Sequence, residues 1–143
     1  MTLTIGRAAA ATGCKVQTIR YYEQIGLLPE APRTAGNQRL YSESHVRRLA
    51  FIRHARELGF PLDAIRDLLS LADDPSQPCD AVDSIARTQL AEVETRIARL
   101  NSLKAELERM ITQCAGGKVA NCRVIEVLHD HSQCLAQDHP KAS

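Results

Sequence analysis

Three cysteines, Cys79, Cys114 and Cys122, are the residues of this sequence whose type and spacing best suit chemistry. Thiolates are preferred ligands of soft and borderline metal ions, and three of them bring three negative charges to one divalent cation. Gly116 and Gly117 lie between the last two thiols, and such a loop is difficult to explain as core packing. The three thiols are therefore predicted to bind a metal ion.

The residues downstream of Cys122 could supply a fourth ligand. A trigonal thiolate site suits mercury or lead, whereas zinc and cadmium usually bind four ligands. Further candidate ligands are His129, His131 and Cys134. Cys14 is instead expected to pack as a small hydrophobic residue.

The segment that must position these cysteines is a long helix, predicted over residues 80–114. Residues 80–113 contain neither Gly nor Pro. Apolar side chains recur there at alternating steps of four and three, interrupted at Lys104, and this spacing is typical of a coiled-coil seam. The seam consists of Ala86, Leu90, Val93, Ile97, Leu100, Leu107, Ile111 and Cys114.

Helix geometry then determines how the thiols can meet. Cys79 and Cys114 are 35 residues apart, which corresponds to about 52 Å along one helix. Because thiolates bind metals at about 2.3 Å, these two cannot share an ion within one chain. In an antiparallel homodimer, Cys79 of one protomer lies beside Cys114 and Cys122 of the other. The sequence thus predicts a homodimer with two metal sites, each using Cys79 from the partner subunit.

The charges divide the chain into a basic head and an acidic tail. Residues 1–70 hold ten Lys and Arg against six Asp and Glu, and residues 71–143 hold eight against eleven. This asymmetry allows nucleic-acid binding by the head although the net charge is +1. The predicted domains are a head (1–72), a linker (73–79), a dimerisation helix (80–114), and a metal-binding loop with a short helix and a mobile tail (115–143).

The head itself contains a predicted helix-turn-helix. Short helices over 5–12 and 16–25 are separated by Gly13, and residues 27–40 have the punctuation of a hairpin that would form a wing. Helices over 43–58 and 61–71 follow. A helix fits the major groove, and most protein contacts go to phosphates. The candidate DNA contacts are Lys15, Gln17, Thr18, Arg20, Tyr21, Arg33, Asn37, Arg39 and Tyr41.

Several short motifs run through the head: Ile5-Gly6-Arg7-Ala8-Ala9, Thr18-Ile19-Arg20-Tyr21-Tyr22-Glu23, Gly26-Leu27-Leu28, Arg39-Leu40-Tyr41, Leu49-Ala50-Phe51-Ile52-Arg53 and Leu58-Gly59-Phe60. Together they resemble the DNA-binding head of the MerR family of bacterial transcription regulators. The resemblance implies a mainly α fold: a winged helix-turn-helix head followed by a long antiparallel coiled-coil dimerisation helix. It also implies promoter control, in which the inducer makes the dimer distort the promoter spacer so that RNA polymerase engages both promoter elements.

The cysteines indicate a branch of that family. Cys79, Cys114 and Cys122 are similar to the three-cysteine pattern of members that sense divalent metals, whereas copper- and silver-responsive members are expected to have Ser at the first position. The resemblance implies Zn(II), Cd(II) or Pb(II) as inducer, with Hg(II) less favoured, and metal-resistance or export genes as targets. Ala115 stands where the zinc type has a second adjacent Cys, so one ion per site is expected.

Two other functions fit the same thiols: a metal-buffering or metal-delivery protein, and a thiol redox sensor that forms a Cys114–Cys122 disulfide. An enzyme is not expected, because no paired carboxylates, phosphate loop or nucleophile–base motif is present. No apolar run approaches the roughly 20 residues that cross a bilayer, and the N-terminus lacks the features of a secretory signal. A cytoplasmic protein with no membrane partner is therefore predicted.

Overall fold

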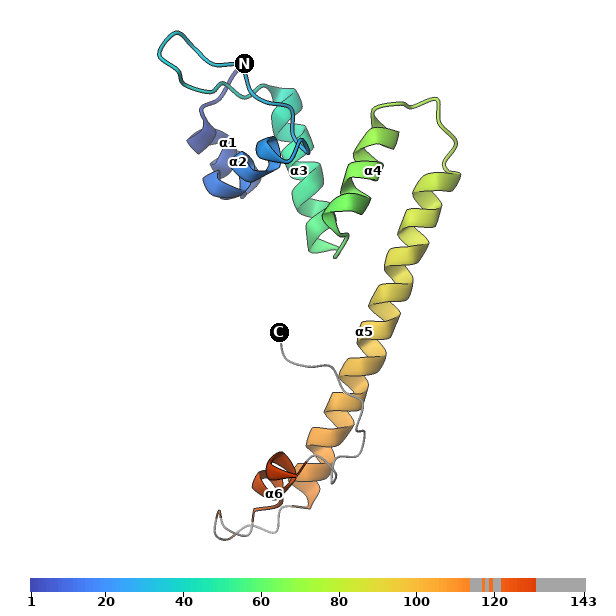
Figure 1. The fold of residues 1–143 in the computed structure, drawn as a ribbon. Helices are drawn as coiled ribbons and strands as arrows, with labels where there is room; N and C mark the ends of the chain where they lie inside the picture. Colours follow the sequence, from blue (N-terminus) through green and yellow to red (C-terminus); the bar gives the residue numbers. More distant parts are fainter. Residues whose placement is uncertain (114–116, 118, 120–121, 131–143) are drawn as a thin grey trace. The chain divides into compact units, whose positions relative to one another are not determined.

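A computed structural model describes residues 1–113, 117, 119 and 122–130 of the chain (Figure 1). These residues are mainly helical, as the sequence predicted. The β pairing among them consists of the isolated antiparallel bridges Leu3–Tyr41 and Arg33–Arg39. The helices are α1 (Ile5–Thr12), α2 (Val16–Gln24), α3 (Glu43–Glu57), α4 (Leu62–Ala72), α5 (Asp80–Thr112) and α6 (Arg123–His129).

The chain divides into two compact units, Met1–Ala86 and Arg87–Ser143. The first unit contains the predicted head and linker together with the first turns of α5.

The turn between α1 and α2 requires a glycine. Thr4 caps α1 by accepting a hydrogen bond from the Arg7 amide at 3.4 Å. Gly13 ends α1 in the left-handed conformation, with a φ of 72°. A Cβ atom at Gly13 would also lie 1.5 Å from Nη1 of Arg53. The positive φ strains any residue with a side chain at this turn, and such a side chain would also displace the Arg53 guanidinium from the Thr12 carbonyl.

The first unit is built around one apolar cluster, to which α1, α2, α3, α4 and the segment between α2 and α3 all contribute. Cys14 is partly buried and packs against this cluster, as expected from the sequence. Because burial of apolar surface is the main force holding such elements together, the cluster fixes α2 against α3 and α4. Its buried members are Ala8, Ile19, Tyr22, Leu27, Leu28, Ala31, Tyr41, Leu49, Ile52, Ala55, Ile65 and Leu69.

A narrow hairpin connects α2 to α3. The Thr34 amide donates to the Gln38 carbonyl at 2.8 Å, and the Leu40 amide donates to the Pro32 carbonyl at 2.9 Å. Asn37 reverses the chain with a φ of 65°, a conformation that Asn tolerates better than most residues. The hairpin was predicted from its Pro and Gly-Asn punctuation.

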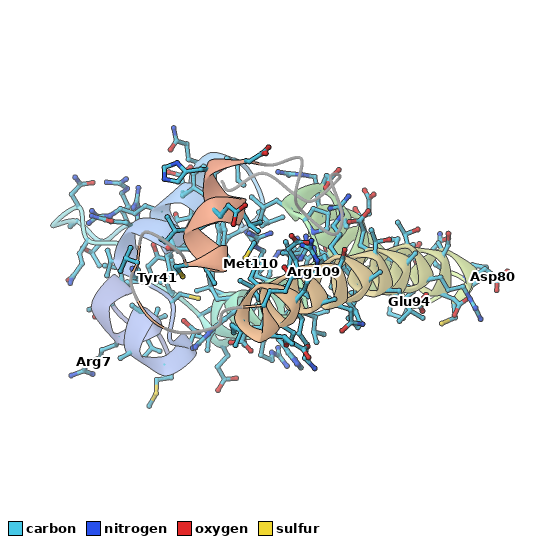
Figure 2. All side chains as sticks on the ribbon, turned by 90° about the horizontal axis from the view of Figure 1, so that it is seen from below. Arg7, Tyr41, Asp80, Glu94, Arg109 and Met110 are labelled. Atoms are coloured by element: carbon cyan, nitrogen blue, oxygen red, sulfur yellow. The ribbon has the colours of Figure 1, made fainter. Side chains whose placement is uncertain are left out.

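Helix α5 is a single helix of 33 residues, about 50 Å long at the usual rise. It begins after Cys79, whose carbonyl accepts from the Asp83 amide at 2.9 Å. At its other end Met110 is buried, and α6 lies alongside with Val127 buried (Figures 1 and 2). None of the helices in the described ranges has the length and apolarity needed to span a membrane.

The predicted seam of α5 is open to solvent over most of its length. Its large apolar side chains are between 51% and 68% exposed, and they recur at heptad spacing along one side of the helix. Single exposed apolar residues are ordinary, but a contiguous stripe of them marks an interaction surface. The stripe comprises Leu90, Ile97, Leu100, Leu107 and Ile111.

Candidate DNA-binding and metal-binding sites

One side of α2 and the hairpin together form a basic concavity of about 480 Å³. Arg20 lies on the helix, and Arg33 and Arg39 lie on the hairpin. Arg33 Nη1 donates to Asn37 Oδ1 at 3.0 Å, so the two side chains hold each other at the hairpin tip. Three guanidinium groups around one depression suit the phosphates of a nucleic-acid backbone. Its lining residues are Ile5, Arg20, Arg33, Gly36, Asn37, Gln38 and Arg39.

The other predicted contacts of α2 lie elsewhere. Lys15 and Thr18 border a second cleft, of about 440 Å³, together with Arg53 and Arg56 of α3. Gln17 is exposed, and Tyr21 is 47% exposed. The predicted contacts of α2 are thus divided between the side that meets the hairpin and the side that meets α3.

Sequence reasoning missed the arginines that secure α1 and α2. Neither helix has a basic residue in its last turn, although the carbonyl end of a helix favours positive charge. Arg53 Nη1 donates to the Thr12 carbonyl at 2.7 Å, and Arg66 Nη2 donates to the Ile25 carbonyl at 2.8 Å. The sequence did contain a signal: neither helix has a cation in its last turn, so donors to its last carbonyls must come from elsewhere in the fold.

Tyr41 was expected to contact DNA, and the structure corrects this expectation. Its side chain is fully buried, with a relative exposure of 0%. The phenol donates a hydrogen bond to Glu23 Oε1, and Glu23 also accepts from the Ala31 amide at 3.3 Å. Arg39 Nε lies 3.8 Å from the same carboxylate. Tyr41 therefore joins α2 to the base of the hairpin and presents no surface to a ligand.

The environment of Tyr41 favours its neutral form. Burial, followed by the hydrogen bond to Glu23, raises the pKa of Tyr41 from 10.0 to about 12. Because the folded-state pKa lies above the unfolded value, the phenol contributes its full stability below about pH 10. That contribution is lost as the pH rises through about 12.

Tyr41→Phe is expected to lower the free energy of unfolding by about 1–3 kcal/mol, since it removes a hydrogen bond from a buried carboxylate. The DNA affinity of the folded protein should not change.

Arg20→Ala should have the opposite effects: the free energy of unfolding should stay the same, and DNA binding should weaken by about 1–3 kcal/mol. Urea unfolding and fluorescence-anisotropy titration at fixed salt measure both quantities. Weakened DNA binding by folded Tyr41→Phe would contradict a purely structural role for Tyr41.

The described metal-ligand candidates lie in different parts of the chain. Cys79 is a free, exposed thiol in the first unit, and Cys122 is a half-buried cysteine immediately before α6. His129 is exposed at the last residue of α6. Cys114, His131 and Cys134 lie outside the described residues.

A single chain does not bring the described donors together. Among the residues with assigned positions, no three His, Cys, Asp or Glu side chains lie close enough to hold a metal ion. In the sequence Cys79 precedes α5 and Cys122 follows it. The donor chemistry nevertheless suits a soft or borderline metal, because thiolates are preferred ligands of such ions.

Comparison with known families matches most of the helical part of the chain. A family model described as "MerR HTH family regulatory protein" matches residues 3–72. A second, described as "MerR, DNA binding", matches residues 46–110. The two matches overlap over residues 46–72, and the second continues along most of α5.

Individual proteins are similar over nearly the whole chain. The HTH-type transcriptional regulator ZntR of Escherichia coli (strain K12) is 42% identical, covering 87% of this chain and 90% of the relative. Heavy metal-dependent transcription regulator 2 of Rhizobium meliloti (strain 1021) is 36% identical, covering 91% and 88%. The crystal structure of the transcription regulator PbrR691 from Ralstonia metallidurans CH34 in complex with lead(II) is 39% identical, covers 88% and 98%, and has a TM-score of 0.75.

Proposed function

Because the chain belongs to the MerR family of helix-turn-helix regulatory proteins, we propose that it is a metal-responsive regulator of transcription that binds promoter DNA as a homodimer. As a member of a family of DNA-binding regulators it is not an enzyme. One observation carries the proposal: a cysteine occurs on either side of a helix whose apolar seam faces solvent.

The exposed seam of α5 supports the homodimer. Five large apolar side chains at heptad spacing need a partner surface, and a second copy of the same helix supplies a self-complementary one. An antiparallel arrangement brings Cys79 of one protomer to the end of α5 of the other. In the sequence Cys114 and Cys122 follow that end, so each proposed metal site draws on both subunits.

The basic concavity supports the DNA interface. Arg20, Arg33 and Arg39 are proposed to contact phosphates beside the groove that receives α2. Gln17 and Tyr21 are exposed on α2 and complete the proposed contacts there with Lys15 and Thr18, while Asn37 extends the contacts at the hairpin tip. When the metal binds, the dimer distorts the promoter spacer, and RNA polymerase then engages both promoter elements.

The thiols favour Zn(II), Cd(II) or Pb(II) as the inducer, with Hg(II) less favoured. Thiolate ligands select soft and borderline cations, and the similar PbrR691 structure contains lead(II). Cys79, Cys114 and Cys122 are the proposed ligands, and His129, His131 and Cys134 are candidates for a fourth. The proposed targets are genes for resistance to, or export of, the same metal.

The proposal is tested by transcription in vitro from the promoter upstream of its candidate target, with each metal added separately. We expect Zn(II), Cd(II) or Pb(II) to activate, and elemental analysis of the purified dimer to find one ion per protomer. A protein that binds these metals but has no salt-dependent affinity for the promoter would be a metal-buffering protein. Activation by an oxidant without metal would identify a redox sensor.

A further inference from the structure

Arg48 of α3 connects the end of α2 to the end of α4. Its Nε donates to the Leu27 carbonyl at 3.0 Å, and its Nη1 lies 3.3 Å and 3.2 Å from the two carboxylate oxygens of Asp73. Leu27 is in turn held to α2, because its amide donates to the Tyr22 carbonyl at 2.9 Å. One guanidinium therefore holds both the residue that leaves α2 and the residue that ends α4.

Asp73 also begins a closed turn. It is the C-cap of α4, and its amide donates to the Leu69 carbonyl at 2.9 Å. The next residue, Asp74, accepts from the Ser76 hydroxyl at 2.6 Å and from Gln77 Nε2 at 2.9 Å. These bonds, the Ser76 hydroxyl first, lower the pKa of Asp74 below its ordinary value. Residues 73–77 thus form an ordered turn.

The turn leads directly to the proposed metal ligand. Pro78 alone separates Gln77 from Cys79, and Pro restricts the backbone on either side of it. A continuous series of bonds therefore runs from α2 through Leu27, Arg48 and Asp73 to the residues that precede Cys79. All of these residues belong to the first unit.

We propose that the Arg48–Asp73 ion pair couples the metal site to the DNA-binding helix. When a metal fixes Cys79, the turn over residues 73–77 is fixed with it, and Arg48 passes the constraint to the end of α2. This inference rests on the proposed function, in which Cys79 is a metal ligand. Coupling of this kind requires a physical element that both sites bias, and the arginine supplies one.

The exposure of the pair indicates its magnitude. The Asp73 side chain is 63% exposed and that of Arg48 is 23% exposed. Ion pairs in such positions contribute little to folding, so the head should fold without this one. Their modest strength predicts that breaking the pair lowers metal-dependent activation by about two- to fivefold.

The test compares three substitutions in the full-length protein. Asp73→Asn keeps the shape of the side chain and removes its charge, whereas Asp73→Glu keeps a carboxylate at this position. Asp67→Asn makes the Asp-to-Asn change at an exposed residue of α4. Transcription with and without Zn(II), promoter affinity without metal, and Zn(II) affinity without DNA are measured for each. For Asp73→Asn we expect the activation ratio to fall about two- to fivefold and both affinities to stay within about twofold of wild type. Asp73→Glu should keep the wild-type ratio of transcription with Zn(II) to transcription without it, and Asp67→Asn should also match wild type.

Three results would overturn the coupling while leaving the proposed function intact. One is an unchanged activation ratio in Asp73→Asn when the wild type responds to metal. Another is a loss of metal-free promoter affinity as large as the loss of activation, which would show that the pair only supports the head. The third is an activation ratio in Asp73→Glu that is as low as the ratio in Asp73→Asn. A wild-type protein that responds to no metal would remove the proposed function, and the coupling with it.

Discussion

Cys79→Ser abolishes metal-dependent activation of transcription and leaves the DNA affinity of the metal-free dimer within about twofold of wild type; this is the largest effect we expect. A serine hydroxyl is a poor ligand for soft cations, so metal affinity should fall by at least about 100-fold. Loss of a residue that only hydrogen-bonds to a metal ligand can already lower affinity by about 100-fold, and loss of a ligand itself should cost more. Folding should be preserved, because Cys79 is exposed. Metal titration monitored by thiolate absorbance and run-off transcription measure the two effects. Cys14→Ala is the matched control, since it removes a thiol that packs against the core.

Mixed dimers test whether the site is shared between subunits. A dimer of one Cys79→Ser protomer and one Cys122→Ser protomer retains one complete site if each site takes Cys79 from the partner subunit. If each chain built its own site, both sites in the mixed dimer would be broken. We therefore expect the mixed dimer to bind one ion and each variant homodimer to bind none. A mixed dimer that binds no ion would exclude the proposed antiparallel arrangement.

Ile97→Asp is expected to dissociate the proposed dimer and to lower promoter affinity by more than about 100-fold. In an antiparallel coiled coil each copy of this substitution buries an unpaired carboxylate in the seam, at a cost of several kcal/mol per ion. The separated protomers then bind half a site each and lose the benefit of simultaneous engagement. Analytical ultracentrifugation and anisotropy titration measure the two losses.

The matched control for the seam is Ala98→Asp. Ala98 is exposed and adjacent to Ile97, but it projects away from the heptad stripe, about 100° further around the helix. The same carboxylate introduced there should leave a dimer with wild-type promoter affinity. A dimer that survives Ile97→Asp, or that is lost equally in Ala98→Asp, would show that α5 does not associate through this stripe.

The helices were predictable because their ends are set by neighbouring residues. The predicted range 5–12 agrees with α1, and the predicted ranges 16–25, 43–58, 61–71 and 80–114 differ from α2, α3, α4 and α5 by one or two residues at their ends. Thr4 and Ser42 cap helices through their side chains, and Gly13 ends α1 in the left-handed conformation. Each of these signals acts over a few residues, so it can be read without knowing the fold.

Tyr41 shows where that reasoning fails. A tyrosine that follows a basic hairpin is of a residue type and at a position that suit contact with DNA. Nothing in the neighbouring sequence distinguishes it from an exposed wing residue. Its burial depends on Leu3, which pairs with it from the N-terminus, and on Glu23 of α2. Both partners are distant in the sequence, so only the folded arrangement could identify the residue as part of the core.

The sequence by itself determined the helices, the heptad stripe of α5 and the thiols that suit a metal ion, because periodicity, capping and ligand chemistry are properties of residue type and spacing. Only the tertiary structure decided which arginines bind backbone carbonyls of other elements. Arg48, Arg53 and Arg66 each donate to a carbonyl at least 21 positions away in the chain. Such contacts follow from the packing of α3 and α4 around the shared core, and that packing is a property of the whole unit rather than of any segment.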